Sequence, residues 1–451
     1  MAPLTFVDLF AGIGGFHHAL AGLGGECGLA VEIDGACQQV YRASFDGFPV
    51  DRLVGDIRSL TLDSAGKERA PEEIRTAIGE PSVLCAGFPC QPFSKSGAQQ
   101  GVLDRTRGTL FYDIMTIIRA SEPEFVILEN VRNLAGPRHR DTWTTIIESL
   151  RESGYRVADE PAVFSPHLLR PEEGGTPQVR DRVFVLAHRV DGGSWEDRIG
   201  EPLVVHEPSP GWNPADWRIA EWLEADKDIP DLDTYSLRDE ELGWIAAWQA
   251  FCEEIPAESL PGFPIWADEF NARAHIPSAC PDWKRDFLLK NAAFYRDAKN
   301  RRVIDRWRKH QWGPLKQRLD DFPPSRRKFE WQARTAQPER ADRDLSKLVL
   351  HLRPSGIRVK PASYLPALVA ITQTSIVGPS VTGGIWRRIT PREAAKLQGI
   401  PPDVFERAGV DNATAYRQLG NAVNVGVVRH VAQALFDDAG ATARGRALVG
   451  V

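Results

Sequence analysis

Short apolar runs alternate with turn residues and helical segments along the first 190 residues of the chain. Strands are expected at Phe6–Phe10, Gly28–Ile33, a short run ending at Ile57, Pro81–Ala86, Glu124–Leu128 and Val183–Ala187. Runs of this length bounded by glycine, proline and polar residues are typical of buried strands. Helices are expected from His17 onward and over Leu110–Ala120. The alternation of strands and helices predicts an α/β fold built on an open sheet.

The first strand continues directly into the turn Ala11-Gly12-Ile13-Gly14-Gly15-Phe16, and a helix follows. In this context glycines allow the backbone to approach a ligand closely, although a tight turn alone explains them equally well. Glu32 lies 20 residues beyond Gly12, where nucleotide-binding folds place an acid on the ribose hydroxyls. Asp56 ends the third strand. These acids predict an adenosine-type cofactor, and the absence of the Walker pattern argues against a phosphate cradle.

Cys90 stands just beyond the strand Pro81–Ala86, within Gly87-Phe88-Pro89-Cys90-Gln91-Pro92-Phe93-Ser94. Taken alone, a free cysteine is more often a small buried apolar residue. The flanking prolines hold this one at the carboxyl end of a strand, which is the edge where open α/β sheets bind ligands. The polar segment Lys95–Thr109 follows, and it is interpreted as a loop that closes over the site.

Two further strands carry charged side chains at their ends. The strand Glu124–Leu128 leads into Glu129, and the segment before Val183 contains Arg180 and Arg182. Residues two apart on an extended segment point to one face. A solvated surface is the default for such an arginine pair, but its place at the start of a buried strand favours a directed role.

Composition and cysteine usage narrow the class of protein. The 451 residues are 42% hydrophobic and 26% charged, and their number predicts two or more domains. No apolar run approaches the roughly 20 residues that span a membrane, and no signal peptide is recognised. The six cysteines show no CxxC pair or metal-ligand spacing, which predicts reduced thiols, a cytoplasmic location and no bound metal. The net charge of −6 argues weakly against nucleic acid, but a total hides local patches.

Taken together, several motifs resemble those of the DNA (cytosine-5) methyltransferases, in that family's order and spacing. They are Asp8–Phe16, Pro89-Cys90-Gln91, Glu129-Asn130-Val131, Gln178-x-Arg180-x-Arg182, Thr390–Gly399 and Gln418–Val423. The resemblance covers about residues 4–190 and 380–435. It implies a doubly wound, mostly parallel sheet of the S-adenosylmethionine-dependent methyltransferase fold, completed by a C-terminal helix near 420–437, and a second, smaller target recognition domain.

The resemblance also implies a reaction. Carbon-5 of cytosine is a poor nucleophile, so a thiolate at Cys90 adds to carbon-6 and activates carbon-5. Glu129 acts at ring nitrogen 3, while Arg180 and Arg182 hold the exocyclic oxygen and stabilise the thiolate. No residue is compelling as the base for the carbon-5 proton, and water is a plausible alternative. The target base is swung out of the duplex.

S-adenosylmethionine is the cofactor that the resemblance implies. The residues expected around it are Phe10, Ala11, Gly12, Gly14, Gly15, Glu32, Ile33, Asp56, Ile57, Pro89, Leu110, Asn421, Ala422 and Val423. Ile33 stands where many members of the family carry an aromatic residue against the adenine, so altered affinity is expected. Gln91 and Ser94 are expected to contact DNA beside the closing loop.

The balance of acidic and basic residues changes between the two blocks of motifs. Residues 191–270 hold 20 acidic residues against 4 basic ones, and residues 283–328 hold 15 basic against 5 acidic. A phosphate-facing surface is expected at Arg301, Arg302, Arg306, Arg308 and Lys309, around Trp307, although a solvated helix face is the simpler interpretation. Three roles are open for the acidic stretch: it packs against the basic one, it keeps the free protein soluble, or it contacts a partner. By resemblance, the residues that read bases lie within about 191–380.

Four other classes were weighed against this interpretation. A DNA amino-methyltransferase is disfavoured because its Asp-Pro-Pro-Tyr or Asn-Pro-Pro-Tyr motif does not occur. A transfer-RNA cytosine methylase shares the chemistry but usually lacks so large a recognition insert. A catalytically silent DNA-binding protein is disfavoured by the intact Cys90, Glu129 and Arg182. A NAD-linked dehydrogenase explains the glycine turn and Glu32, but not the Pro-Cys-Gln-Pro segment.

The sequence therefore predicts a bacterial-type DNA (cytosine-5-)-methyltransferase. Its expected domains are a catalytic and cofactor-binding domain at 1–190, a target recognition domain at 191–400, and a segment at 401–451 that returns to the first. A monomer acting on double-stranded DNA in the cytoplasm, associated with the nucleoid when bound, is expected. A cognate restriction endonuclease or other phage-defence protein is its expected partner.

Overall fold

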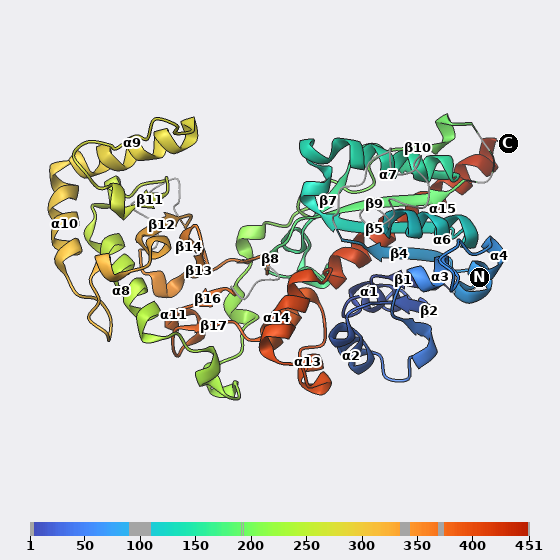
Figure 1. The fold of residues 1–451 in the computed structure, drawn as a ribbon, viewed down its shortest axis with the longest axis horizontal. Coiled ribbons are helices and arrows are strands. Elements are labelled where there is room, and N and C mark those ends of the chain that lie inside the picture. The colour runs from blue at the N-terminus through green and yellow to red at the C-terminus, as the bar shows by residue number, and fades with distance from the viewer. Residues whose placement is uncertain are drawn as a thin grey trace. The chain divides into compact units, whose positions relative to one another are not determined.

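The computed structural model describes residues 4–89, 110–190, 192, 194–333, 343–368 and 374–449. These residues divide into two compact units, coloured along the chain in Figure 1. Unit 1 contains the described residues up to Ala215 and from Ala394 onward, and unit 2 contains those from Asp216 to Glu393. The boundaries expected from the sequence were 190 and 400. No helix in the described part of the chain is long and apolar enough to cross a membrane.

Unit 1 is built on one sheet, which has nine strands within the described residues. Their order is β10-β6-β9-β5-β4-β1-β2-β3, and β7 also pairs with β9. The strands are β1 Thr5–Leu9, β2 Glu26–Val31, β3 Leu53–Val54, β4 Val83–Gly87, β5 Phe125–Val131, β6 Tyr155–Ala158, β7 Ala162–Phe164, β9 Arg182–Arg189 and β10 Ile199–Gly200. The five strands from β3 to β5 are parallel, and β9 runs antiparallel to β5, β6 and β7. The prediction of a doubly wound, mostly parallel sheet is confirmed.

Helices cover both faces of this sheet (Figure 1). They are α1 Gly15–Ala21, α2 Gly35–Ser44, α3 Arg58–Thr61, α4 Pro71–Ile78, α6 Leu110–Ser121, α7 Arg140–Glu152, α13 Val404–Ala408, α14 Asn412–Asn421 and α15 Val425–Val449. Val7 and Leu9 of β1 are buried in one core cluster with α4, α6 and α7. Phe6 points to the other face, where its ring meets His17 of α1 at 5.3 Å. On that face Phe436 of α15 contacts Phe125 of β5.

The C-terminal helix expected near 420–437 is present as α15, but it begins at Val425 and extends to Val449. Helix α14 ends at Asn421 and α15 begins at Val425. Ala422 is extended between them, and the side chain of Asn424 accepts a hydrogen bond from the backbone N–H of Val427 at 3.0 Å. This is the N-cap arrangement for which asparagine is well suited. Because of this break, the Asn421–Val423 segment lies beside the glycine turn that follows β1.

Unit 2 contains a second sheet, with six strands in the described residues and the order β11-β12-β14-β13-β16-β17. The strands are β11 Ile265–Trp266, β12 Lys328–Trp331, β13 Val349–Arg353, β14 Gly356–Lys360, β16 Ile376–Val377 and β17 Arg387–Arg388. The helices are α8 Asp239–Glu254, α9 Asp282–Arg296, α10 Ala298–Lys309 and α11 Pro379–Thr382, and α12 Pro391–Gln398 crosses the boundary between the units. Trp248 and Trp307 lie in the apolar core between this sheet and the helices α8 and α10.

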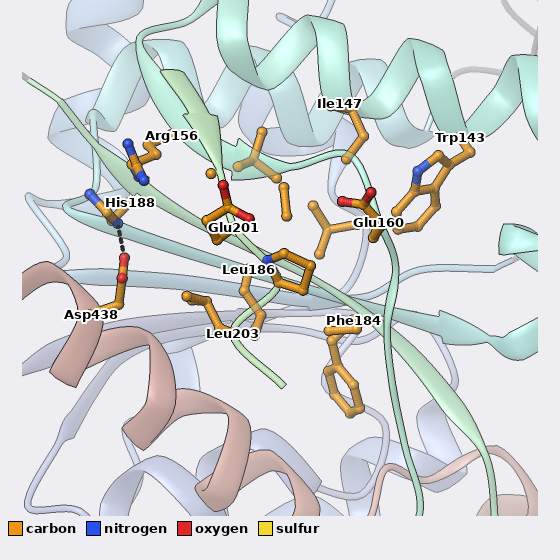
Figure 2. A pocket seen from close by; sticks show the side chains of 16 residues that line it. Trp143, Ile147, Arg156, Glu160, Phe184, Leu186, His188, Glu201, Leu203 and Asp438 are labelled. Carbon is orange, nitrogen blue, oxygen red and sulfur yellow. Dashed lines mark ion pairs between the residues drawn. The ribbon is translucent and has the colours of Figure 1, made fainter. Parts of the chain in front are cut away.

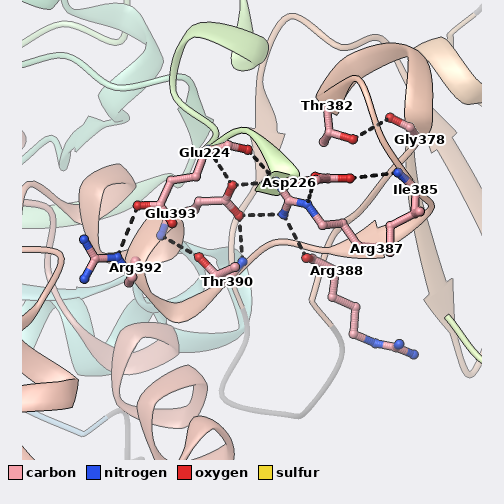
Figure 3. Close-up of polar contacts among 10 residues, drawn as sticks. All are labelled: Glu224, Asp226, Gly378, Thr382, Ile385, Arg387, Arg388, Thr390, Arg392 and Glu393. Carbon is pink, nitrogen blue, oxygen red and sulfur yellow. Dashed lines mark hydrogen bonds and ion pairs between the residues drawn. The ribbon is translucent and has the colours of Figure 1, made fainter. Parts of the chain in front are cut away.

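A buried ion-pair network in unit 2 is centred on Arg387 (Figure 3). The side chains of Arg387 and Glu393 are both 0% exposed, and their charged groups are joined at 2.8 and 2.9 Å. Asp226 accepts from Nε of Arg387 at 2.7 Å, and the carbonyls of Glu224 and Arg388 accept its remaining N–H groups. All five guanidinium N–H groups are therefore satisfied. Acidic residues of the 191–270 stretch thus hold the strand that precedes α12.

The Glu393→Gln substitution is expected to lower the free energy of unfolding by about 3–5 kcal/mol, because it leaves a buried arginine with one carboxylate fewer. Guanidinium chloride unfolding of the full chain measures this loss. The matched control is Asp286→Asn on α9, whose carboxylate pairs with Lys290 at 2.6 Å while both side chains are about half exposed. That change is expected to cost about 0–1 kcal/mol. Equal losses in the two variants would contradict the assignment.

Candidate active site

The expected site residues lie along one edge of the unit 1 sheet. Strands β3, β2, β1, β4 and β5 are parallel neighbours, so their carboxyl ends meet at the same edge. Asp56, Glu32, the glycine turn, Pro89 and Glu129 follow these strands or stand at their ends in this spatial order. The strand order reverses between β1 and β4, because β2 and β3 follow β1 on one side and β5 follows β4 on the other. Open α/β sheets bind ligands at such a switch point.

The turn after β1 has a backbone that favours glycine. Phe10, Gly12 and Gly14 adopt positive φ angles of 61°, 56° and 89°. A Cβ atom on Gly14 would lie 2.3 Å from the ring of Phe45, so this position excludes a side chain for two reasons. Phe10 is not a glycine, and its left-handed conformation stores strain of a kind that clusters at ligand sites. The turn at the edge of the sheet therefore has the kind of strained backbone that is found at ligand sites.

Glu32 connects the ends of β1 and β2. Its carboxylate accepts hydrogen bonds from the backbone N–H of Gly12 at 2.8 Å and of Asp34 at 2.7 Å. Burial raises the pKa of Glu32, and the backbone donors oppose that shift. The neighbouring Ile33 is 70% exposed, which is unusual for an isoleucine. On the far side of β2, Asp56 pairs with Arg58 at 3.0 Å, and Ile57 is buried.

The Asn421–Val423 segment closes one side of the turn. A Cβ atom on Gly15 would lie 2.6 Å from Cγ2 of Val423 and 2.8 Å from its carbonyl oxygen. Only a glycine allows the first turn of α1 to approach this segment so closely. Ala422 and Val423 are largely buried, whereas Asn421 is exposed. Two expected cofactor segments more than 400 residues apart are therefore in contact.

Glu129 is a buried carboxyl at the end of β5, with only 6% of its surface exposed. Its Oε1 lies 2.9 Å from Nε of Arg182 on the neighbouring strand β9. Burial raises the pKa of Glu129, while the charges of Arg182 and Arg180 oppose the shift. The carboxyl therefore retains a proton at higher pH than an ordinary glutamate does. It is suited to donating a hydrogen bond or a proton.

Arg180 has different surroundings from Arg182, although both are close enough to influence Glu129. Arg180 is 1% exposed and donates to the carbonyls of Gly420 at 2.8 Å and Ala422 at 2.5 Å. It follows the short strand β8 Gln178–Val179, and its backbone N–H donates to Ser165. These bonds fix the break between α14 and α15. No pattern in the sequence indicated this role.

Gly87, at the end of β4, stands beside Glu129 in the register of the sheet. A Cβ atom there would lie 3.5 Å from the Glu129 carboxyl, 3.7 Å from Phe16 and 3.9 Å from Val423. The two halves of the site therefore converge on the residue three positions before Cys90. The buried amide of Asn130 donates to the carbonyl of Phe88 at 2.8 Å and ties the ends of the two strands together. Asn130 was recognised as part of a motif but not as a positioning residue.

Cys90, Gln91, Ser94 and the loop Lys95–Thr109 lie outside the described residues. Pro89 is exposed at the end of the described β4 segment, and Leu110 begins α6. Burial raises the thiol pKa of Cys27, Cys37 and Cys252 to about 12. It raises the pKa of Cys85 well above its ordinary value. These four cysteines are therefore poor sources of a thiolate.

The basic residues of α10 mostly have partners within unit 2. Arg301 pairs with Asp305 at 3.7 Å, Arg306 pairs with Glu254, and Arg308 donates to the carbonyls of Ala267 and Phe270. Arg302 and Lys309 are exposed, while Trp307 is buried in the core. The ion pair Arg327–Asp268 adds a second link between the basic and acidic stretches at 3.2 Å. Packing of these two stretches on each other is thus confirmed.

A hollow lies at the opposite end of the sheet order (Figure 2). It opens where the partner of β9 changes from β6 to β7, and Leu186 is at this gap. Arg156, Glu160 and Glu201 line it, and His188 pairs there with Asp438 at 3.6 Å. None of the expected catalytic or cofactor residues lines this hollow.

Comparisons with known proteins identify the family of this chain. The family model described as C-5 cytosine-specific DNA methylase matches residues 4–437. Type II methyltransferase M.AluI of Cellulosimicrobium cellulans is 40% identical over 507 aligned positions, which cover 95% of this chain and 91% of that protein. M.BanI of Aneurinibacillus aneurinilyticus is 29% identical over 96% of each chain. M.HpaII of Haemophilus parainfluenzae is 40% identical over 44% of this chain and 50% of its own length.

Proposed function

Because the chain belongs to the family of C-5 cytosine-specific DNA methylases, we propose that it methylates a flipped-out cytosine in duplex DNA through a covalent adduct with Cys90. The observation that carries this proposal is the buried, protonatable Glu129 beside Arg182, at the sheet edge that also bears the glycine turn. We propose that the Cys90 thiol acts beside this carboxyl.

The residues of the glycine turn fit S-adenosylmethionine as the donor. The exposed Ile33 offers an apolar surface to an adenine, and the carboxyl of Glu32 is fixed beside it by two backbone bonds. Bound there, the donor supplies an electrophilic methyl group. The remaining contacts to the donor are proposed for Phe10, Ala11, Gly12, Gly14, Gly15, Asp56, Ile57, Pro89, Leu110, Asn421, Ala422 and Val423.

The Gly15→Ala substitution is expected to weaken binding of S-adenosylmethionine by roughly tenfold or more. Its new methyl group overlaps Val423, and overpacking of this kind costs about 1–3 kcal/mol. Isothermal titration calorimetry without DNA measures the change. Gly35→Ala at the start of α2 is the matched control, because a Cβ atom there meets nothing within 4 Å. A dissociation constant unchanged within twofold would show that the two segments do not form one site.

The side chains of the site have distinct roles in the proposed reaction. The Cys90 thiolate would form a bond to carbon-6 and shift the ring electrons toward carbon-5. Carbon-5 would then form a bond to the methyl group as the bond between that methyl group and the donor's sulfonium sulfur breaks, with the electron pair left on the sulfur. Glu129 holds a proton at ring nitrogen 3 as negative charge develops there. Arg182 orients Glu129, and Arg180 positions the Ala422 segment. Loss of the carbon-5 proton to water then expels the thiolate and restores the aromatic ring.

Unit 2 is proposed to read the DNA sequence, with Gln91 and Ser94 contacting DNA beside the target base. The type II methyltransferases among the relatives support a role in restriction and modification, and hence a cognate endonuclease that acts on the same site. A monomer is sufficient, because one subunit modifies one strand at a time.

The proposed chemistry is tested with duplex DNA that carries 5-fluorocytosine at every cytosine. Fluorine does not leave as a proton does, so wild-type protein and S-adenosylmethionine are expected to give a DNA adduct that survives denaturation. The adduct should require S-adenosylmethionine, because methylation precedes the blocked step. If a folded protein that binds the donor forms an adduct with transfer RNA and none with duplex DNA, the DNA substrate is wrong. An adduct with neither substrate overturns the covalent mechanism.

A further inference from the structure

The two faces of the unit 2 sheet differ sharply in chemistry. Side chains alternate between faces along a strand. Phe329 and Trp331 of β12, Leu350 and Leu352 of β13, and Ile357 and Val359 of β14 all lie in the apolar core. The residues between them must point to the other face. That face carries Trp266, Lys328, Glu330, His351, Arg353, Arg358 and Lys360.

This polar face has an excess of positive charge. Lys328, Arg353, Arg358 and Lys360 stand on it with Glu330 as the one carboxylate among these described residues. Burial and the neighbouring charges of Arg358 and Arg353 lower the pKa of Lys360. Burial and Arg358 lower the pKa of Arg353 in the same way. Within the described chain, neither Arg353 nor Lys360 has an ion-pair partner, so a bound anion would relieve this repulsion.

Arg358 is held differently from its neighbours. Oε2 of Glu330 accepts hydrogen bonds from both Nε and Nη2 of Arg358, at 3.0 and 2.8 Å. Gln332 in turn donates to the other oxygen of Glu330. These contacts fix the plane of the guanidinium, while its Nη1 makes no hydrogen bond to the part of the chain that is described. A pre-oriented arginine with free donors suits bidentate recognition of a planar acceptor pair.

Aromatic rings extend from the same face toward the surface. Nζ of Lys328 lies 5.4 Å from the ring centre of Trp266. Phe287 of α9 contacts Trp266 and also Trp283, which is 61% exposed. Basic side chains interleaved with aromatic ones are typical of nucleic-acid surfaces. Helix α10 differs, because three of its six basic residues have partners within unit 2.

We propose that the polar face of the β13–β14 hairpin contacts the DNA and that Arg358, held by Glu330, reads a guanine of the recognition sequence. A two-stranded ribbon fits the major groove, where guanine offers O6 and N7 to one arginine. Arg353 and Lys360 bind phosphates on either side. This inference rests on the proposed function and assigns the reading of DNA within unit 2 to particular side chains.

The first test separates base contacts from phosphate contacts. Unmethylated plasmid DNA is methylated by wild-type protein and sequenced after bisulfite treatment, which defines the recognition sequence. Arg358→Ala is expected to lose about 5- to 150-fold in kcat/KM on that sequence, because this is the discrimination of one bidentate pair. It should also methylate sequences that differ at a single guanine. The same loss without relaxed sequence choice would assign Arg358 to folding or phosphate binding and overturn its reading role.

The second test uses salt dependence. The double variant Arg353→Ala/Lys360→Ala is expected to keep the sequence choice and to reduce the slope of log affinity against log salt by about 2, since each phosphate contact contributes about 0.9. Arg42→Ala/Lys67→Ala, which removes two exposed positive charges from unit 1, is the matched control and should leave the slope unchanged. Arg302→Ala/Lys309→Ala on α10 is measured alongside it. A reduced slope in the α10 variant alone would transfer the DNA surface to that helix and overturn the proposal.

Glu330→Gln tests the holding of Arg358 without removing it. It is expected to weaken the sequence preference at the same position as Arg358→Ala does, but to a smaller extent. The denaturant midpoint of unfolding should be unchanged. The 5-fluorocytosine adduct keeps the two proposals apart. If wild-type protein forms no adduct, the covalent function fails. If wild-type and Arg358→Ala proteins form adducts with the same sequence choice, only the reading role of Arg358 fails.

Discussion

Replacement of Cys90 by alanine is expected to abolish methyl transfer, with a fall in the single-turnover rate of about 10⁴-fold or more. Without the thiolate, carbon-5 of cytosine is never activated, and no other group of the site forms the bond to carbon-6. Loss of a nucleophile is not compensated by binding or positioning alone. The rate is measured by transfer of a radiolabelled methyl group to duplex DNA with enzyme in excess.

The Cys90→Ala protein should still bind S-adenosylmethionine and DNA, because the glycine turn and unit 2 are untouched. Cys280→Ala is the matched control, since Cys280 is a partly exposed cysteine of unit 2, outside the proposed site. It is expected to retain the wild-type rate and the 5-fluorocytosine adduct. An adduct formed by Cys90→Ala would assign the nucleophile to another residue.

The second large effect is expected at Glu129. Glu129→Gln should reduce the single-turnover rate by about 10²- to 10⁴-fold, the usual contribution of a positioned acid. Glutamine has nearly the same shape and still donates a hydrogen bond, but it cannot transfer a proton. Asp181 forms an ion pair with Arg132 at 2.6 Å near the same strand, and Asp181→Asn is a control with the same change of charge. A Glu129→Gln rate above one tenth of the wild-type rate would contradict the assignment.

The pH profile gives an independent measure of the role of Glu129. Burial raises its pKa, and the protonated form is the active one, so this group contributes activity below its pKa and loses it as the pH rises through that value. Ionisation of Cys90 acts in the opposite direction. The wild-type rate should therefore pass through a maximum, and Glu129→Gln should lose the fall on the alkaline side. An alkaline fall that persists in the variant would belong to another group.

The sequence predicted the parallel strands and the edge on which the site lies because both depend on local pattern. Short apolar runs ended by glycine or an acid mark β1, β2 and β5 whatever lies around them. The glycine turn and Glu32 could be paired because their spacing reflects one strand–helix–strand unit. The order and spacing of several motifs, taken together, then indicated the family.

Contacts between distant segments could not be predicted in this way. The expected helix near 420–437 begins only at Val425, and Arg180 binds the carbonyls of Gly420 and Ala422 just before it, 240 and 242 residues further along the chain. The basic residues of α10 indicated a phosphate surface because their acidic partners, such as Glu254, are about 50 residues away. The hairpin of β13 and β14 was not among the elements expected from the sequence. Its alternation of Leu352, Arg353, Ile357 and Arg358 had a period of two that was overlooked.

The contact between Gly15 and Val423 has a consequence for the order in which the protein folds during its synthesis. Unit 2 lies between the two parts of unit 1, so the ribosome completes it before the last residues of unit 1 emerge. Unit 2 is therefore able to form while the glycine turn still lacks the Ala422 segment and α15. The turn receives its partner only after more than 400 further residues have been synthesised. The edge of the unit 1 sheet that bears the glycine turn is therefore completed only at the end of synthesis.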